Sequence, residues 1–292
     1  MNAQVKDTHT ALNLSDVEAS SLVTLYSRAI ESQSPDPILR DEMAVEIIRQ
    51  LDPVLAGSPD ALVRSLSRHE VDKNLVIHIA LRARRYDQYA RDFLRRYPDG
   101  VVVNLGCGMD TRFFRLDDGQ LVLFDLDLPE VIALKRQFIS ENDRYHMIAA
   151  SVFDYGWMDQ VAQRGLGDVL FLAEGVFMYL DPVEVKSLIL ELQSRFPGAE
   201  LVCEVVNSLW LSKLFKPMIQ RKMQRGAGLG KGAVFNFGIP DGRALEAWNP
   251  GIEFLDEWSY FESDHPKLGW IGWFGRFKLF SRTQWTVHYR LN

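Results

Sequence analysis

The hydrophobic pattern divides this chain into two parts. Up to residue 97, apolar residues recur at helical spacing. Beyond it, apolar runs alternate with amphipathic segments, which is typical of a parallel sheet covered by helices on both faces. Residues 1–14 are polar and are expected to be poorly ordered. Three helical regions should follow, from Ser15 or Asp16 to Ser34, from Asp41 to just before Pro53, and from about Asp60 to Tyr97.

The second part predicts seven strands and three intervening helices. The strands are Val101–Leu105, Leu121–Asp125, Tyr145–Ala149, Val169–Ala173, Leu201–Val206, Ile252–Tyr260 and Thr283–Tyr289. The helices begin near Pro129, Trp157 and Pro182, and two of them carry proline in the first turn, where its missing N–H costs no hydrogen bond. We therefore expect an α/β fold built on a mostly parallel sheet.

Length and composition fit one large domain with added segments. The 292 residues, 47% of them hydrophobic, suffice for a full core. We divide the chain into an N-terminal helical cap that forms the substrate region, 1–97, and an α/β core, 98–292. Within the core, 207–241 carries basic residues followed by a glycine-rich stretch and predicts a lid-like insertion. A solvated surface helix with a tether is the alternative.

Charge and cysteine content argue against several classes of protein. A formal net charge of −6 argues against nucleic acid as the principal partner, because phosphate binding leaves a basic footprint. Cys107 and Cys203 lie in or beside apolar runs, so neither a disulfide framework nor a thiolate metal site is expected, and no metal is predicted. No apolar run is long enough to cross a bilayer. We expect a protein of the reducing cytoplasm with no membrane partner.

The turn after the first predicted strand is the first candidate for a ligand site. The apolar run from Val101 breaks at Gly106, Cys107 and Gly108, where glycines tolerate unusual backbone angles and close ligand approach. A nucleotide-like cofactor binds at this place in many α/β proteins, although such turns also occur for packing alone. We interpret Cys107 as a small residue between two glycines rather than as a nucleophile.

Polar residues also follow the next two strands. Asp125 and Asp127 lie about twenty residues after the glycine turn, the spacing at which such folds place a carboxylate against ribose hydroxyls. Side chains alternate along a strand, so both would point the same way, and spacing does not decide between them. Ser151 and Val152 follow the third strand, where a backbone amide or a short side chain reaches an adenine edge.

Two charged residues in apolar surroundings require partners. Glu174 follows a fully apolar strand, and a carboxylate there is costly to desolvate unless it meets a cation or several donors. Arg82 lies within the apolar stripe of the third helical region, whereas several neighbouring arginines project from the other side. An arginine in such a stripe needs a buried partner or a ligand.

These charges favour one kind of cofactor. Thr111 stands where the third glycine of the G-x-G-x-x-G dinucleotide pattern would fall, and Glu174 would repel phosphates. A ligand with an amine, ribose hydroxyls and a carboxylate matches Glu174, Asp127 and Arg82 respectively. S-adenosylmethionine has all three groups, so we expect it as the cofactor.

Five runs of residues occur together in this chain. They are NLGCGMDTR from Asn104, DLDLPEV from Asp125, AEGVFMYL from Ala173, RAIES from Arg28 and PDPIL from Pro35. In this combination, over about residues 20–206, the chain resembles the leucine carboxyl methyltransferase family, and most closely its bacterial branch that O-methylates polyketides. The resemblance implies a class I S-adenosylmethionine-dependent methyltransferase, with a Rossmann-like seven-stranded sheet whose last strand is antiparallel.

The resemblance also implies roles for individual residues. It places Arg82 on the methionine carboxylate, Gly106 and Gly108 against the methionyl portion, Asp127 in preference to Asp125 on the ribose, Ser151 and Val152 at the adenine, and Glu174 near the amine. Arg28 is a candidate for a second cation from the amino-terminal region, and Tyr179 is a candidate substrate contact. Ser151 stands where relatives often have an aspartate, which favours an adenine contact through the main chain.

The expected reaction is O-methylation of a small-molecule acceptor, forming a methyl ester on a carboxyl group of a polyketide-like or other secondary metabolite. A carboxylate is already ionised at neutral pH, and the sequence has no recognisable histidine–carboxylate pair beside the motifs. A phenolic acceptor would require a base, for which His265 is the candidate. Phenolic methylation, methylation of a protein's terminal carboxylate and a non-catalytic cofactor-binding role remain alternatives. The oligomeric state stays open, a homodimer included.

Overall fold

The computed structural model describes residues 16–164, 168–212, 234–263, 265–269 and 281–292. The polar start of the chain and the basic and glycine-rich part of the predicted insertion lie outside these residues. The lid therefore stays a prediction, as does the division of the chain at residue 97.

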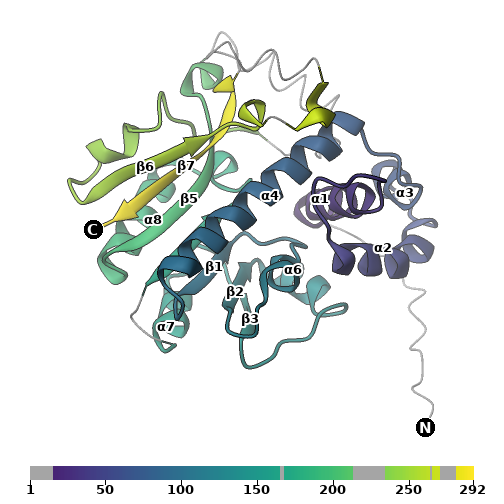
Figure 1. Cartoon of the computed structure of the whole chain (residues 1–292), viewed down its shortest axis with the longest axis horizontal. Coiled ribbons are helices and arrows are strands. Elements are labelled where there is room, and N and C mark those ends of the chain that lie inside the picture. The colour runs from purple at the N-terminus through teal and green to yellow at the C-terminus, as the bar shows by residue number, and fades with distance from the viewer. Residues whose placement is uncertain (1–15, 165–167, 213–233, 264, 270–280) are drawn as a thin grey trace.

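A seven-stranded sheet forms the centre of the molecule (Figure 1). Its strands are β1 (Val101–Leu105), β2 (Val122–Asp127), β3 (Tyr145–Ala149), β4 (Val169–Ala173), β5 (Ala199–Val206), β6 (Ile252–Trp258) and β7 (Gln284–Leu291). Strands β1 to β5 pair in parallel, and β7 runs antiparallel to both β5 and β6. The predicted strands, the mostly parallel sheet and its antiparallel last strand are confirmed.

The strand order determines where ligands bind. Across the sheet the order is β3-β2-β1-β4-β5-β7-β6, so the chain moves outward from β1 to β3 and then crosses back to β4. Open α/β sheets bind ligands at such a reversal, outside the carboxyl ends of the strands. The register also aligns Asn104 with Asp125 and Asp127 with Ala149, which brings the polar ends of β1, β2 and β3 together.

Helices cover both faces of the sheet. The helices are α1 (Asp16–Ser32), α2 (Glu42–Leu55), α3 (Ala61–Ser67), α4 (Lys73–Arg96), α5 (Arg112–Leu116), α6 (Pro129–Lys135), α7 (Gly156–Ala162) and α8 (Pro182–Arg195). Short 3₁₀ turns are η1 (Phe177–Tyr179), η2 (Ser208–Leu211), η3 (Ala244–Ala247) and η4 (Tyr260–Glu262). The first six α-helices share one apolar core with the sheet, and α7 and α8 form the core on the other face.

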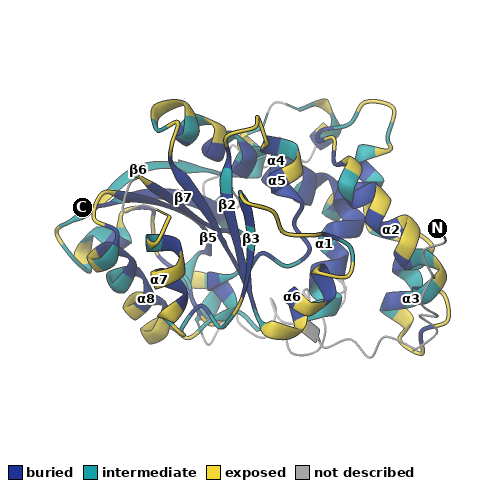
Figure 2. Cartoon of the chain, turned by 90° about the horizontal axis from the view of Figure 1, so that it is seen from below, coloured by how far each residue is buried: buried dark blue, intermediate teal, exposed yellow. Residues whose placement is uncertain are grey.

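The N-terminal helices are continuous with the packing of the sheet. Leu22 of α1 and Ile48 of α2 belong to the same buried cluster as Val102 of β1 and Leu123 of β2. In Figure 2 this buried surface extends from the sheet into α1 and α2. Each fully buried leucine or isoleucine contributes about 1.5–3 kcal/mol relative to an exposed one, so this shared core fixes the N-terminal helices over the sheet.

Two predictions about helices were wrong, and one short helix was missed. The single helix expected over 60–97 is broken between α3 and α4, because His69 adopts a left-handed φ of 58° and Asp72 caps a new helix through the N–H groups of Asn74 and Leu75. Helix α2 runs past Pro53 to Leu55; the proline lies in the last turn, where it removes only one hydrogen bond. The short helix α5, directly after the glycine turn, was not predicted.

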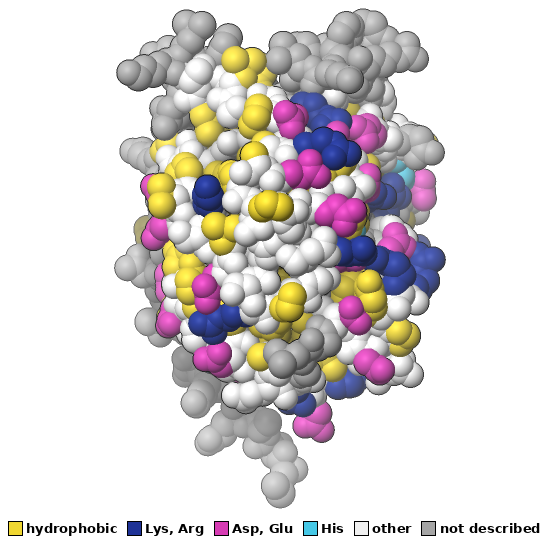
Figure 3. Space-filling view, turned by 90° about the vertical axis from the view of Figure 1, so that its left-hand side faces the viewer, with side chains coloured by type: hydrophobic (Ala, Val, Ile, Leu, Met, Phe, Trp, Pro, Cys, Tyr) yellow, Lys and Arg dark blue, Asp and Glu magenta, His cyan; other side chains and the backbone are white. Residues whose placement is uncertain are grey.

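The surface carries mixed charge. On the face in Figure 3, acidic and basic side chains are interspersed with isolated hydrophobic ones. Within the described parts of the chain, no helix has the length and apolar character needed to cross a membrane.

Candidate functional site

The loop after β1 requires glycine at both predicted positions. Gly106 and Gly108 have φ values of +63° and +51°, in the left-handed region that L side chains avoid. A Cβ at Gly106 would also lie 2.5 Å from Cγ2 of Val176, in the segment after β4. The loop therefore closes against the end of β4, at the reversal of strand order. Burial raises the pKa of the Cys107 thiol, so it stays protonated, in accord with its interpretation as a packing residue.

Asp127 ends β2 with its carboxylate at this loop. It accepts hydrogen bonds from the backbone N–H groups of Gly108 at 2.6 Å and Leu128 at 2.7 Å. No lysine, arginine or histidine of the described chain forms an ion pair with it, although the residue is only 8% exposed. Burial raises the pKa of Asp127, against the opposing effect of the two N–H groups. A buried carboxylate of this kind is stabilised by further hydrogen-bond donors, such as hydroxyls.

Asp125 points to the same side of β2 but has a different environment. Its carboxylate accepts hydrogen bonds from Lys135 at 2.6 Å, the Tyr145 hydroxyl at 2.5 Å and Asn104 at 3.1 Å. Both oxygens are occupied, and the residue is 2% exposed. The assignment of Asp125 as a cofactor contact is therefore corrected. Asp125 anchors α6 and β3 to the end of β2, and Asp127 is the candidate for the ribose contact.

The loop after β3 lies beside Asp127. The Ala150 N–H donates to the Asp127 carbonyl at 3.0 Å. Ser151 follows and accepts through its hydroxyl from the Phe153 N–H at 3.2 Å. Val152 is buried in the core of the α7 and α8 face. The predicted adenine residues thus sit next to the predicted ribose residue, at the adjacent strand end.

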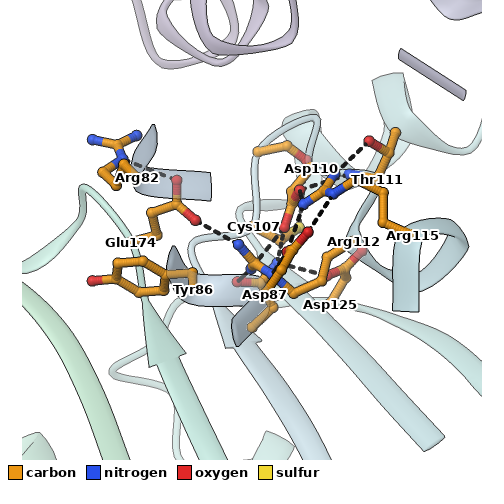
Figure 4. Close-up of polar contacts among 12 residues, drawn as sticks. Arg82, Tyr86, Asp87, Cys107, Asp110, Thr111, Arg112, Arg115, Asp125 and Glu174 are labelled. Atoms are coloured by element: carbon orange, nitrogen blue, oxygen red, sulfur yellow. Dashed lines mark hydrogen bonds and ion pairs between the residues drawn. The ribbon is translucent and has the colours of Figure 1, made fainter. Parts of the chain in front are cut away.

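Glu174 and Arg82 meet each other directly. Arg82 Nε donates to Glu174 Oε1 at 2.9 Å, and Arg112 Nη2 donates to Glu174 Oε2 at 2.6 Å. Figure 4 shows Glu174 between the two guanidinium groups. The two residues that the sequence identified as charges in need of partners therefore pair with one another, and neither needs a ligand to balance its charge.

Arg112 was missed by the sequence interpretation, although it ends the first quoted run. It is 1% exposed and binds three carboxylates from different elements, those of Asp87, Asp110 and Glu174. Its place directly after the glycine turn, the first candidate for a ligand site, was the available signal. Arg112 thereby links Glu174 to Asp110, in the loop that contains the two glycines.

Arg28 of α1 holds the loop after β1. Its Nε pairs with Asp41 at 2.9 Å, and its Nη2 donates to the Met109 carbonyl at 2.7 Å. Thr111 donates to the same Asp41. Arg28 is 3% exposed, and both contacts are structural. We assign it to holding the loop rather than to contacting a cofactor.

Gly175 allows the approach of Arg82. Its φ is +71°, and a Cβ there would lie 3.2 Å from Nη1 and 3.4 Å from Nη2 of Arg82. The guanidinium thus rests on the backbone after Glu174. Nη2 forms no hydrogen bond with any residue that the structure describes, so one nitrogen of the group remains available.

A second buried carboxylate lies on the other side of Arg82. Glu204 of β5, 2% exposed, accepts from Arg82 Nη1 at 2.8 Å and from Gln284 at 2.8 Å. Burial works against ionisation, but Arg82, His78 and Gln284 hold the pKa of Glu204 below its usual range. His78 Nε2 lies 3.9 Å from Glu204 Oε1. An acid inside the apolar run of the fifth strand was visible in the sequence, yet neither Glu204 nor His78 was assigned to the site.

The two weaker candidates lie in different places. Burial and the charge of Glu204 raise the pKa of Tyr179 to about 12, which places this residue near the Arg82 and Glu204 pair. His265 accepts through Nδ1 from the Lys267 N–H at 3.3 Å. No hydrogen bond or ion pair in the described residues joins His265 to Asp127, Glu174 or Arg82.

These residues fit S-adenosylmethionine. Within the part of the chain that the structure describes, Asp127 has only two backbone donors, which leaves acceptor capacity for ribose hydroxyls, and Arg82 Nη2 is free to donate to a carboxylate. The site is built at the ends of β1, β2, β3 and β4. Among the described residues, no group of three or more histidine, cysteine, aspartate or glutamate side chains is arranged to hold a metal ion.

Comparison with known proteins gives a consistent result. The sequence profile of the leucine carboxyl methyltransferase family matches residues 21–193. The tetracenomycin polyketide synthesis O-methyltransferase TcmP of Streptomyces glaucescens is 31% identical over 267 residues, covering 89% of this chain and 91% of the relative. The S-adenosyl-L-methionine-dependent methyltransferase dpfgK of Gibberella zeae is 28% identical over 285 residues, covering 92% and 90%.

Solved structures with similar folds are more distant. The magnesium protoporphyrin IX methyltransferase of Synechocystis PCC 6803, solved with bound S-adenosylhomocysteine, is 12% identical. It covers 86% of this chain and 100% of its own, with a TM-score of 0.47.

Proposed function

The chain belongs to the leucine carboxyl methyltransferase family, and from this premise we propose that it transfers a methyl group from S-adenosylmethionine to an oxygen of a small molecule. The family match spans the glycine loop, Asp127 and Glu174. A carboxyl group of a polyketide-like or other secondary metabolite is the leading acceptor, and the product is then a methyl ester.

Asp127 is the observation that carries this proposal. It is a buried carboxylate with two backbone partners and no ion pair within the described chain, beside a loop whose two glycines hold left-handed backbone angles. Ribose hydroxyls supply the missing donors. A phosphate group would be repelled there, which argues for a nucleoside cofactor without phosphates.

The remaining contacts follow from the strand ends. In this proposal Ser151 and Val152 border the adenine, and Gly106 and Gly108 border the methionyl portion. Arg82 Nη2 donates a hydrogen bond to the carboxylate of the cofactor. Glu174 accepts a hydrogen bond from the cofactor's amine and keeps Arg112 as its second partner. S-adenosylmethionine supplies an electrophilic methyl group on a sulfonium sulfur, and the protein contributes mainly by holding the acceptor oxygen in line with it.

A hydroxyl group is the second candidate acceptor. The expectation of a carboxyl group rested partly on the lack of a base beside the motifs. The folded chain places His78 beside Glu204, one turn of α4 from Arg82. This observation favours an acceptor that must lose a proton.

Methyl transfer to a panel of acceptors tests the proposal. Wild-type protein with S-adenosylmethionine labelled in its methyl group is incubated with aryl carboxylic acids, phenols and a peptide ending in a free carboxylate. We expect label in a small molecule, released by mild base if the product is an ester. Tight cofactor binding without transfer to any acceptor would identify a non-catalytic relative, and transfer only to the peptide would identify a protein methyltransferase.

A further inference from the structure

We propose that His78 is the general base for methylation of a phenolic hydroxyl, and that Glu204 is the residue that orients it. The inference rests on the proposed function and takes its second candidate acceptor, a hydroxyl group, in place of the carboxyl group. It assigns a role to a histidine and a buried carboxylate that the cofactor site leaves unexplained.

The position of His78 follows from the geometry of α4. Residues four apart lie on the same face of a helix, so His78 sits one turn from Arg82. Both side chains reach Glu204, Arg82 at 2.8 Å and His78 at 3.9 Å. Since Arg82 is the residue proposed to hold the methionine end of the cofactor, His78 lies one helical turn from that proposed contact.

The imidazole ring is held in one orientation. It stacks on the ring of Tyr260 with centroids 4.4 Å apart and an interplanar angle of 16°. Tyr260 begins η4, which packs against α4 and lies near its amino-terminal end in Figure 1. Nε2 faces the carboxylate of Glu204, so Nδ1 is the nitrogen left to accept a proton.

The charged and titratable groups beside the ring come from three elements. Glu204 faces it from β5, Tyr260 from η4, and Arg82 lies along its own helix. Burial raises the pKa of Tyr260 to about 12, so this hydroxyl stays neutral near pH 7. Tyr179, also held neutral, lies near the same Glu204. Aromatic rings and neutral hydroxyls beside a histidine suit a planar phenol better than an anionic carboxylate.

A second histidine–carboxylate pair in the chain shows what a purely structural one looks like. The side chain of His288 is 11% exposed and hydrogen-bonds Glu200 at 2.9 Å, in a cluster with Arg96 and Arg290. The side chain of His78 is 21% exposed and makes no hydrogen bond to any residue that the structure describes; its nearest carboxylate oxygen, on Glu204, lies 3.9 Å away. The ring of His78 is thus oriented but still partly exposed, as is required of a base that must contact a substrate.

The proposed step is a direct transfer of the methyl group from sulfur to the phenolic oxygen. The phenolic O–H bond breaks and its proton passes to Nδ1 of His78, while the oxygen lone pair forms a bond to the methyl carbon. The bond between that carbon and sulfur breaks, sulfur keeps the electron pair, and S-adenosylhomocysteine is released. The imidazolium then returns its proton to solvent. A phenol has a reference pKa near 10, so at neutral pH this base is needed.

His78→Gln is the decisive variant, with His69→Asn as the matched control. His69 lies in the break between α3 and α4, and asparagine tolerates its left-handed φ. For His78→Gln we expect a loss of kcat with phenols of about 10²–10⁴-fold. Activity on carboxylic acids, where present, and S-adenosylhomocysteine affinity by calorimetry should stay within about threefold. The wild-type rate with phenols should rise with pH through one ionisation that the variant lacks.

A spectroscopic measurement complements the kinetics. The chain has six histidines, so the imidazole signals of labelled protein can be assigned by their loss in single variants. The His78 signal should shift when a phenol is added to the protein with S-adenosylhomocysteine. Phenol methylation by His78→Gln at the wild-type rate, or wild-type activity on carboxylic acids alone, overturns this inference but leaves the proposed function standing. A wild type that methylates neither class overturns both.

Discussion

Arg82 Nε donates to Glu174 Oε1 at 2.9 Å, although the two residues are 92 positions apart in the chain. Each is a charge placed in an apolar environment, and each is the other's partner. Arg112 and Glu204 extend the pair into a four-residue chain of alternating sign. The charges of these four side chains therefore balance one another, so in the proposed function the cofactor shares these partners rather than supplying missing ones.

The Arg82–Glu174 pair should show measurable coupling. Arg82→Met removes the arginine partner of the buried Glu204 and one of the two arginine partners of Glu174, and should lower the free energy of unfolding by about 3–5 kcal/mol. Glu174→Gln should cost less, and the double variant should be more stable than the sum of the two losses predicts, by about 1–3 kcal/mol. Urea unfolding measures all three. Arg84→Met, on the same helix and without an ion pair in the described residues, serves as the control, and strictly additive losses would contradict the coupling.

Replacing Asp127 should weaken cofactor binding without unfolding the protein. Asp127→Ala removes the acceptor proposed for ribose hydroxyls, and we expect S-adenosylmethionine affinity to fall by about 10–100-fold, since hydrogen bonds to charged groups contribute about 1.5–3 kcal/mol. Calorimetry measures the change. Asp159→Asn, at an exposed carboxylate on α7, is the control. Equal affinity of Asp127→Ala and wild type would refute the assignment of Asp127.

The same residue gives the binding a pH dependence. Burial raises the pKa of Asp127 in the free protein, and hydroxyl donors from a ligand favour its ionised form. Affinity should therefore be constant above that raised pKa and fall by up to tenfold per pH unit below it, with proton release on binding in the acidic range. In Asp127→Ala this dependence should disappear.

A Cβ at Gly106 should be incompatible with the closed loop. Gly106→Ala meets Cγ2 of Val176 at 2.5 Å and also forces a non-glycine residue to a φ of +63°. We expect a loss of stability of about 2–4 kcal/mol, from the backbone conformation and the overlap together. The double variant with Val176→Ala should recover the steric part and leave the conformational cost of about 1–2 kcal/mol. No recovery in thermal unfolding of the double variant would show that the overlap is not the cause.

Acid stability should depend on Glu200. Burial opposes its ionisation, but hydrogen bonds from His288, Arg96 and Arg290 hold its pKa far below the ordinary value of 4.5. A folded-state pKa below the unfolded value means that this group stabilises the fold above about pH 4.5 and loses that contribution as the pH falls further. Glu200→Gln should cost about 3 kcal/mol at pH 7 and should reduce the dependence of stability on acid. Denaturant unfolding from pH 7 to pH 3 measures both.

Local pattern determined the framework of this protein. All seven strands and the glycine turn were predicted because burial on a sheet and left-handed backbone angles leave a mark on consecutive residues. Asp127 and Glu174 were located for the same reason, since each stands at the end of an apolar run. Pattern failed at the break before α4, where a histidine took a left-handed conformation, and at Pro53, which the last turn of α2 tolerates.

Only the tertiary structure decided which charges belong together. Periodicity indicates that Arg82 faces the core, but its partners come from the ends of β4 and β5, and no local rule specifies them. The same holds for Asp125, whose hydrogen bonds with Lys135 and Tyr145 distinguish it from Asp127, and for His78 of α4, whose Nε2 lies 3.9 Å from Glu204 of β5. A sequence records which side of an element is buried; electrostatic partners are set by the packing of elements that are distant along the chain.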